Sequence, residues 1–103
     1  MTNQNYIVKS PILFLIFNRP DVTLSVFEQI KKVKPSRLYI AADGPRKGKN
    51  NEEELCFETR LIVSQIDWDC EVKTLFREVN LGCKYAVSSA ISWFFDNEVE
   101  GII

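Results

Sequence analysis

A continuous run of six apolar residues, Ile12 to Phe17, constrains the fold of this chain more than any other feature. A strand with one face in water alternates apolar and polar side chains, whereas a strand covered on both faces is apolar throughout. Strands of the second kind occur in parallel sheets with helices on both sides. The run is also far too short to cross a bilayer, which takes about 20 residues. It therefore predicts a buried strand of a parallel sheet.

The segment after this run has the pattern of an amphipathic helix. Pro20 and Asp21 suit its first turn, because a proline there loses no hydrogen bond and a carboxylate is favoured at the positive end of the helix dipole. Pro35 ends the segment. The apolar residues at helical spacing, which we expect to form the buried stripe, are Leu24, Phe27, Ile30 and Val33.

Two more helices and three more strands complete the pattern. Asn51 is expected to cap a second helix, whose first turn holds three glutamates at 52–54. A third helix is expected from about Cys83 to Asp96. The further strands are expected at 37–42, at 71–77 and from 101 onward.

The order of these elements, βαβαβαβ, predicts the fold class. It is typical of an α/β protein with a mostly parallel, Rossmann-like three-layer sandwich and right-handed crossovers. Residues 1–103 are expected to form a single domain. Because the chain stops two residues into an apolar strand, we expect a domain truncated after the start of strand four, the first part of a larger one. The open edge of that fourth strand predicts self-association.

Composition excludes several functional classes. The chain has no histidine, so neither a Ser-His-Asp nor a Cys-His catalytic arrangement can be built. Its three cysteines are widely spaced and form no CxxC pair, which argues against a zinc site. A net charge of −1 gives no general attraction for nucleic acid. The polar N-terminal stretch MTNQNYIVKS does not have the pattern of a secretion signal, so a cytoplasmic location is expected.

Polar residues follow each of the first three predicted strands. Asn18 and Arg19 follow the first, Asp43 and Gly44 the second, and the turn containing Gly82 the third. Ligands of open α/β sheets bind at the carboxyl ends of the strands, where the strand order reverses. The sequence therefore predicts a binding site at this edge of the sheet.

The residue types at this edge suit a nucleotide. The carboxylate of Asp43 would accept a hydrogen bond from a ribose hydroxyl or a base N–H, and Arg19 would bind a phosphate. Phe17 or Asn18 would contact the base. Each residue also has a purely structural interpretation: Asp43 can form a turn, Arg19 can pair with Asp21, and Phe17 can belong to the core. Neither GxGxxG nor GxxxxGK[ST] follows the first strand.

Three blocks of sequence resemble the N-terminal half of GT-A fold nucleotide-diphospho-sugar transferases. They are PILFLIFNRPD at 11–21, RLYIAADGPR at 37–46 and REVNLGCKYAVSSAISWFF at 77–95. The chain is similar to inverting bacterial glycosyltransferases of the family-two type. It is also similar to the N-acetylglucosaminyltransferase I family, which shares an arginine after the first strand and an acidic residue at the end of the second. The resemblance spans nearly the whole chain.

The resemblance implies a nucleotide site at particular positions. Phe17 would lie against the base, and Arg19 near the ribose or diphosphate. Asp43, beside Gly44, would accept from the uracil N3–H or the ribose. At the start of the third helix, Gly82 and Lys84 would lie beside the base or the phosphates. The donor would be a UDP-sugar, and the acceptor of the parent enzyme a glycan or a lipid-linked molecule, which is compatible with a membrane-peripheral location.

The resemblance also implies parts that these residues do not supply. Such enzymes use Mn²⁺ or Mg²⁺, held by an acidic DxD-type motif just after the fourth strand, where this sequence ends. Asp67-Trp68-Asp69 has the right letters but is expected to be a helix-exit turn. The metal site and the catalytic base are therefore expected outside these residues, and the fragment itself is expected to be inactive. The alternatives are a non-catalytic α/β nucleotide-binding or interaction module and, with less support, a nucleotidyltransferase.

Overall fold

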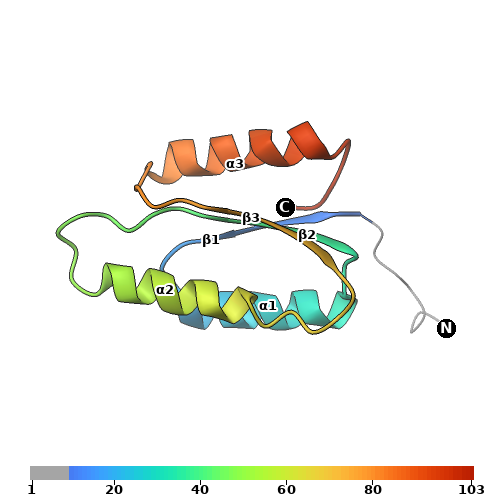
Figure 1. Ribbon diagram of the computed structural model, residues 1–103, viewed down its shortest axis with the longest axis horizontal. Coiled ribbons are helices and arrows are strands. Elements are labelled where there is room, and N and C mark those ends of the chain that lie inside the picture. Colours follow the sequence, from blue (N-terminus) through green and yellow to red (C-terminus); the bar gives the residue numbers. More distant parts are fainter. Residues whose placement is uncertain (1–9) are drawn as a thin grey trace.

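Helices and strands alternate along residues 10–103, the part of the chain that the computed structural model describes (Figure 1). Residues 1–9, most of the polar stretch that argues against a secretion signal, lie outside it. Three strands form a parallel sheet in the order β1-β2-β3, which confirms the predicted α/β class. The elements are β1 (Ile12–Ile16), α1 (Pro20–Val33), β2 (Arg37–Ala42), α2 (Glu52–Val63), β3 (Glu71–Phe76) and α3 (Cys83–Asn97).

The central strand β2 is covered on both sides, as its composition requires. Its even-numbered residues, Leu38, Ile40 and Ala42, pack in one core with residues of α1 and α2. The alternate residues Tyr39 and Ala41 pack in a second core under α3. Figure 1 shows the resulting layers, with α1 and α2 on one face and α3 on the other. The prediction of helices on both faces is confirmed.

The predicted fourth strand is present as a single parallel bridge between Ile102 and Ile12. The Leu13 N–H donates to the Ile102 carbonyl at 2.7 Å, and the Ile102 N–H donates to the Pro11 carbonyl at 2.9 Å. The chain therefore returns on the side of β1 opposite to β2. As a result the order in space is β3-β2-β1-Ile102, and the chain changes direction across the sheet at β1.

The buried stripe of α1 differs from the predicted one. Thr23, Phe27 and Ile30 are buried, whereas Leu24 and Val33 are 47% and 42% exposed. The buried residues are spaced i, i+4, i+7 and form a narrow stripe toward the sheet. Leu24 and Val33 flank this stripe, so the prediction that they are buried is wrong.

The predicted start of α2 is confirmed, with Asn51 at the N-cap position and the three glutamates in the first turn, but the predicted capping bond is wrong. Asn51 precedes the helix with φ 65°, in the left-handed region, and its side chain makes no capping hydrogen bond. The helix ends at Val63. None of the three helices in residues 10–103 has the length and apolar character needed to cross a bilayer.

Candidate functional site

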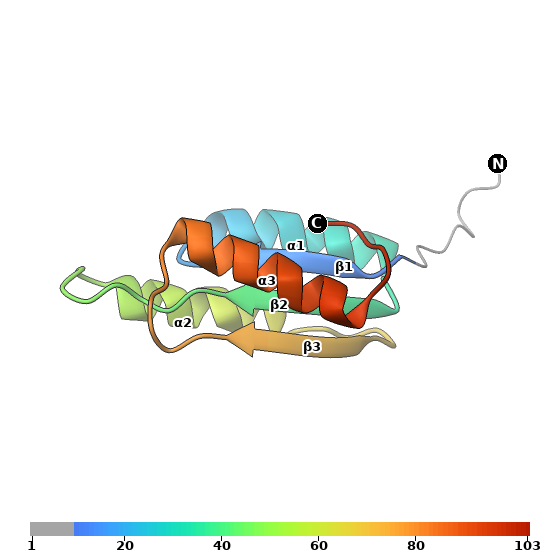
Figure 2. The ribbon, with the colours of Figure 1, turned by 90° about the horizontal axis from the view of Figure 1, so that it is seen from above.

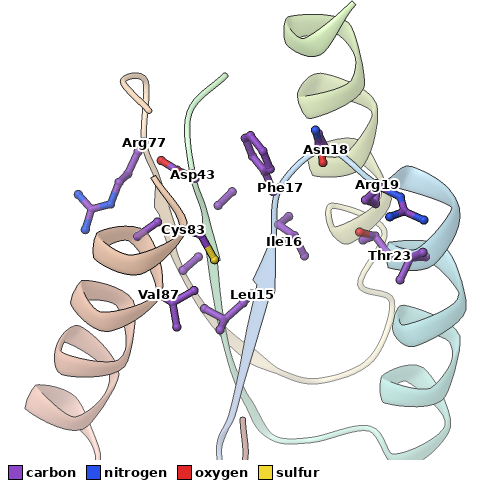
Figure 3. Close-up of a pocket in the computed structure, with 14 residues that line it drawn as sticks. Leu15, Ile16, Phe17, Asn18, Arg19, Thr23, Asp43, Arg77, Cys83 and Val87 are labelled. Atoms are coloured by element: carbon purple, nitrogen blue, oxygen red, sulfur yellow. The ribbon is translucent and has the colours of Figure 1, made fainter. Parts of the chain in front are cut away.

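A cleft of about 390 Å³ opens at the carboxyl ends of β1 and β2. Figure 3 shows that it lies between the first turn of α1 and the first turns of α3. Leu15, Phe17 and Val87 give it an apolar lining, and Arg19, Asp43 and Cys83 also line it. Open α/β sheets bind their ligands at this end of the sheet, where the strands end, and the cleft lies next to β1, where the chain changes direction across the sheet.

Four of the seven residues predicted for the site line this cleft. They are Phe17, Asn18, Arg19 and Asp43. The other three, Gly44, Gly82 and Lys84, are not among its lining residues. The nucleotide-binding roles of all seven stay predictions, and the contacts of each residue narrow what it can do.

The carboxylate of Asp43 accepts four hydrogen bonds from its own chain. Oδ1 accepts from the backbone N–H groups of Gly44 and Leu81, both at 2.8 Å. Oδ2 accepts from the Gly82 N–H and from the Asn80 amide, both at 3.1 Å. A carboxylate has about four acceptor positions, so this set of partners uses them. Asp43 thus joins the end of β2 to the loop that starts α3.

Glycine is required where these two loops meet. A Cβ on Gly44 would lie 2.7 Å from backbone atoms of Glu78 and Val79, so the close approach of the loops depends on its absence. Gly82 precedes α3 with φ 85°, a conformation that side chains disfavour. Both glycines therefore shape the cleft without lining it. Lys84 is exposed, with its ammonium 5.8 Å from the centre of the Tyr85 ring.

Arg60 of α2 fastens the carboxyl ends of β2 and β3. Its Nη2 donates to the carbonyl of Asp43 at 3.0 Å and to that of Arg77 at 2.8 Å. The guanidinium also lies 5.0 Å from the centre of the Phe76 ring. These contacts hold one side of the cleft in place.

At the start of α2, the buried carboxylate of Glu52 forms an ionic cluster with Arg46 and Asn18. Its side chain is only 5% exposed. The Arg46 guanidinium donates to both carboxylate oxygens, at 2.7 and 2.9 Å, and the Arg46 backbone N–H donates at 2.7 Å. The Asn18 amide donates to Oε1 at 3.1 Å. Arg46 also lies 5.8 Å from the centre of the Phe17 ring, so the cluster anchors the two residues that follow β1.

Hydrogen bonds from Arg46 lower the pKa of Glu52 from 4.5 to about 2. A lowered pKa in the folded state means that the ionised form stabilises the fold. This stabilisation is complete above pH 4.5 and is lost as the pH falls toward 2. We expect Glu52→Gln to reduce the slope of unfolding free energy against pH in this window, by up to about one proton. Urea denaturation at a series of pH values measures that slope.

The matched control is Glu54→Gln, two residues along the same helix turn, where the side chain is exposed. It should leave the slope close to that of the unaltered chain. Equal slopes for Glu52→Gln and the unaltered chain would contradict the structural role of the cluster.

Arg19 is the cation of the cleft whose side chain is held most weakly by its own chain. Its side chain is 67% exposed, and it approaches Asp21 at 3.6 Å, the pairing that the structural interpretation expected. An exposed pair of this kind is weak, so an anionic ligand can compete with Asp21 for the guanidinium. The first turn of α1, with Pro20 at its start, adds the positive end of a helix dipole beside it.

Sequence reasoning missed three polar residues of the cleft. Thr23, Arg77 and Cys83 line it as well. Arg77 follows β3 directly, so the rule that identified Arg19 and Asp43 would also have found it. Figure 3 shows its guanidinium directed away from the cleft, where Nη2 donates to the Ser89 hydroxyl at 2.9 Å. Cys83 lies at the start of α3, between the predicted site residues Gly82 and Lys84, so the same reasoning would have found it as well.

Within residues 10–103, no three carboxylate or thiol side chains gather in a way that could hold a metal ion. The donor set that Mn²⁺ or Mg²⁺ prefers is therefore not assembled by the described residues. Asp67 of the Asp-Trp-Asp stretch pairs with Lys31 at 3.4 Å. The indole of Trp68 donates to the Pro35 carbonyl at 2.9 Å. This stretch connects α2 to the start of β3. It therefore lies at the amino-terminal end of the sheet, opposite to the cleft.

Comparison with known proteins adds no assignment: no family model, no curated protein and no solved structure matches the chain.

Proposed function

We propose that the cleft binds the nucleotide of a nucleotide-diphospho-sugar, with uracil as the base, and that the chain is the donor-binding part of a glycosyltransferase. The supporting observation is the position of the cleft, at the carboxyl ends of β1 and β2 where the chain changes direction across the sheet. A volume of about 390 Å³ lies within the usual range of small-molecule sites.

The chemistry of the lining suits the parts of such a ligand. Phe17 and Val87 offer apolar surface to a base, and the guanidinium of Arg19 stands at the rim, where a diphosphate would lie. Asp43 has its acceptor positions filled by its own chain. In this proposal its main role is to hold the loop before α3, and a direct contact with uracil or ribose requires it to exchange one of these partners.

In a longer parent protein, the sugar would pass from the bound donor to a hydroxyl of a glycan or lipid-linked acceptor. A divalent metal would have to be held outside residues 10–103, because the described residues assemble no such metal site, and in this proposal the general base also lies outside them. For the described part of the chain we therefore propose binding and orientation of the donor, and no chemical step.

A non-catalytic module is the second candidate. The observation that favours it is the complete use of Asp43 by its own chain, which is what a structural turn residue would show. If this module is an interaction module, no nucleotide occupies the cleft, so occupancy by a nucleotide separates it from the first candidate.

Cys83 provides a direct test of occupancy. It is exposed and lines the cleft, whereas Cys56 is buried and Cys70 lies half-buried elsewhere. Burial raises the pKa of both Cys56 and Cys70, which slows their alkylation. We expect saturating UDP to slow alkylation of Cys83 by iodoacetamide at least about fivefold, because a pocket covers most of its ligand. Peptide mass spectrometry measures each thiol separately.

Two controls make the result specific. Cys70 should be alkylated at the same rate with and without UDP. Arg19→Ala should raise the UDP concentration needed for half-protection about tenfold, because a charge-assisted hydrogen bond is lost. Arg37→Ala, at the opposite end of the sheet, should leave it unchanged. An unprotected Cys83, or equal protection of Cys70, would contradict the proposed function.

A further inference from the structure

The outer edge of β3 is open. Among residues 10–103, β3 pairs with β2 alone and ends the sheet. Figure 2 shows β3 along one margin of the molecule, with neither α2 nor α3 extending over its outer side. An unpaired edge of this length is a template for another strand.

The hydrogen bonds to β2 show which backbone groups point outward. The Glu71 N–H donates to the Ser36 carbonyl and the Arg77 N–H to the Ala42 carbonyl. Odd-numbered residues of β3 therefore bond inward. The N–H and carbonyl groups of Val72, Thr74 and Phe76 are directed to the open edge, because inward and outward groups alternate along a strand.

We propose that two copies of this chain pair through β3 in antiparallel fashion, with Thr74 opposite Thr74 of the second copy at the two-fold axis. In this register Val72 lies opposite Phe76. The outward-directed backbone groups of Val72, Thr74 and Phe76 all form hydrogen bonds with the second copy. The pairing is isologous, so each contact occurs twice. It would join the two sheets into one.

Charge selects this register over its neighbours. It places Glu71 opposite Arg77 twice, at positions where the side chains approach closely. Shifting the two-fold axis to Lys73 sets Lys73 against Lys73, and shifting it to Leu75 sets Lys73 against Arg77 twice. Like charges directly opposite are destabilising. Among these three registers, only the one centred on Thr74 pairs the whole of β3 and also sets opposite charges, those of Glu71 and Arg77, against each other.

Exposed apolar side chains beside the edge favour burial by a second copy. Val72 and Phe76 are 39% and 37% exposed although they belong to a sheet. Phe57 of α2, which is 63% exposed, lines the same depression as Glu78 just beyond β3. Leu61 lies one turn further along α2 and is also exposed. These side chains would flank the new strand pair on the α2 face.

Sedimentation velocity from low micromolar to near-millimolar concentration tests the proposal. We expect the unaltered chain to show a reversible monomer–dimer equilibrium. Thr74→Pro should remain folded but monomeric, because the N–H that it removes points outward and proline is tolerated at such edge positions. Thr74→Val keeps the N–H and should still dimerise. A chain that stays monomeric throughout would overturn the proposal, as would a dimer that survives Thr74→Pro.

A charge swap tests the register and remains decisive if Thr74→Pro fails to fold. Glu71→Arg should weaken the dimer on the order of tenfold, because it sets like charges opposite each other twice. Adding Arg77→Glu should restore the affinity. Equal dissociation constants for all three proteins would overturn the register.

Discussion

Phe94→Ala is expected to lower the free energy of unfolding by about 3–5 kcal/mol, the usual cost of removing a large core aromatic ring. Phe94 is fully buried, and its ring packs edge-on against that of Tyr39 with centroids 4.9 Å apart. The ring also lies directly above Gly101, where an added Cβ would come within 2.3 Å of it. Its loss would loosen both α3 and the returning segment that pairs with β1.

The neighbouring ring provides the matched control for this prediction. Phe95 is 44% exposed, and Phe95→Ala should cost less than about 1 kcal/mol. Urea denaturation of the two variants compares them directly. Similar losses for the two variants would contradict the account of how α3 is held on the sheet. Since α3 carries Cys83 and Val87, Phe94→Ala should also widen the cleft and speed alkylation of Cys83.

Asp43→Ala is expected to cost about 2–4 kcal/mol of unfolding free energy, because it removes the acceptor of several backbone N–H groups at once. Three of these four hydrogen bonds come from backbone N–H groups, and the fourth comes from Asn80. Asp43→Asn should be nearly as destabilising. An amide would direct its own N–H donors at groups that also donate.

The asparagine variant separates the two roles of Asp43. Thermal denaturation measures its stability. Asp21→Asn serves as the control, since Asp21 lies near the cleft in the first turn of α1 and its side chain is 77% exposed. That control should change stability by less than about 0.5 kcal/mol. If Asp43→Asn keeps full stability but loses affinity for UDP, Asp43 is a ligand contact and the structural account of its four hydrogen bonds is wrong.

The parts of the fold that periodicity controls were predictable from the sequence. The apolar run that becomes β1 and the alternation of elements gave the parallel sheet with helices on both faces, because burial on two sides leaves a direct imprint on composition. Strand order is different. The charged Glu71 and Lys73 of β3 are of the kind found on edge strands, but the exposure of Val72 and Phe76 follows from tertiary pairing.

The rule that ligands bind at the carboxyl ends of the strands located the correct end of the sheet. It did not predict the hydrogen bonds and ion pairs around the cleft. It found Phe17 and Arg19, which line the cleft. The pairing of the buried Glu52 with Arg46 could not be inferred, because glutamate in the first turn of a helix is usually solvated and here a loop folds back over it. Likewise, the capture of Asp43 by the loop before α3 joins residues 37 to 39 positions apart. Local sequence carries no signal for it.

The binding of a nucleotide in the cleft is best tested by an amide-shift titration of the chain with UDP, alongside ADP and GDP. We expect shifts at the residues after β1, at Thr23, and at the first turns of α3, with UDP preferred. Arg37 and Glu98 pair at 3.5 Å at the opposite end of the sheet, and their amide signals should not shift. Shifts centred on that opposite end of the sheet, or no shifts at millimolar UDP, would contradict the proposal that this chain binds a nucleotide-sugar donor.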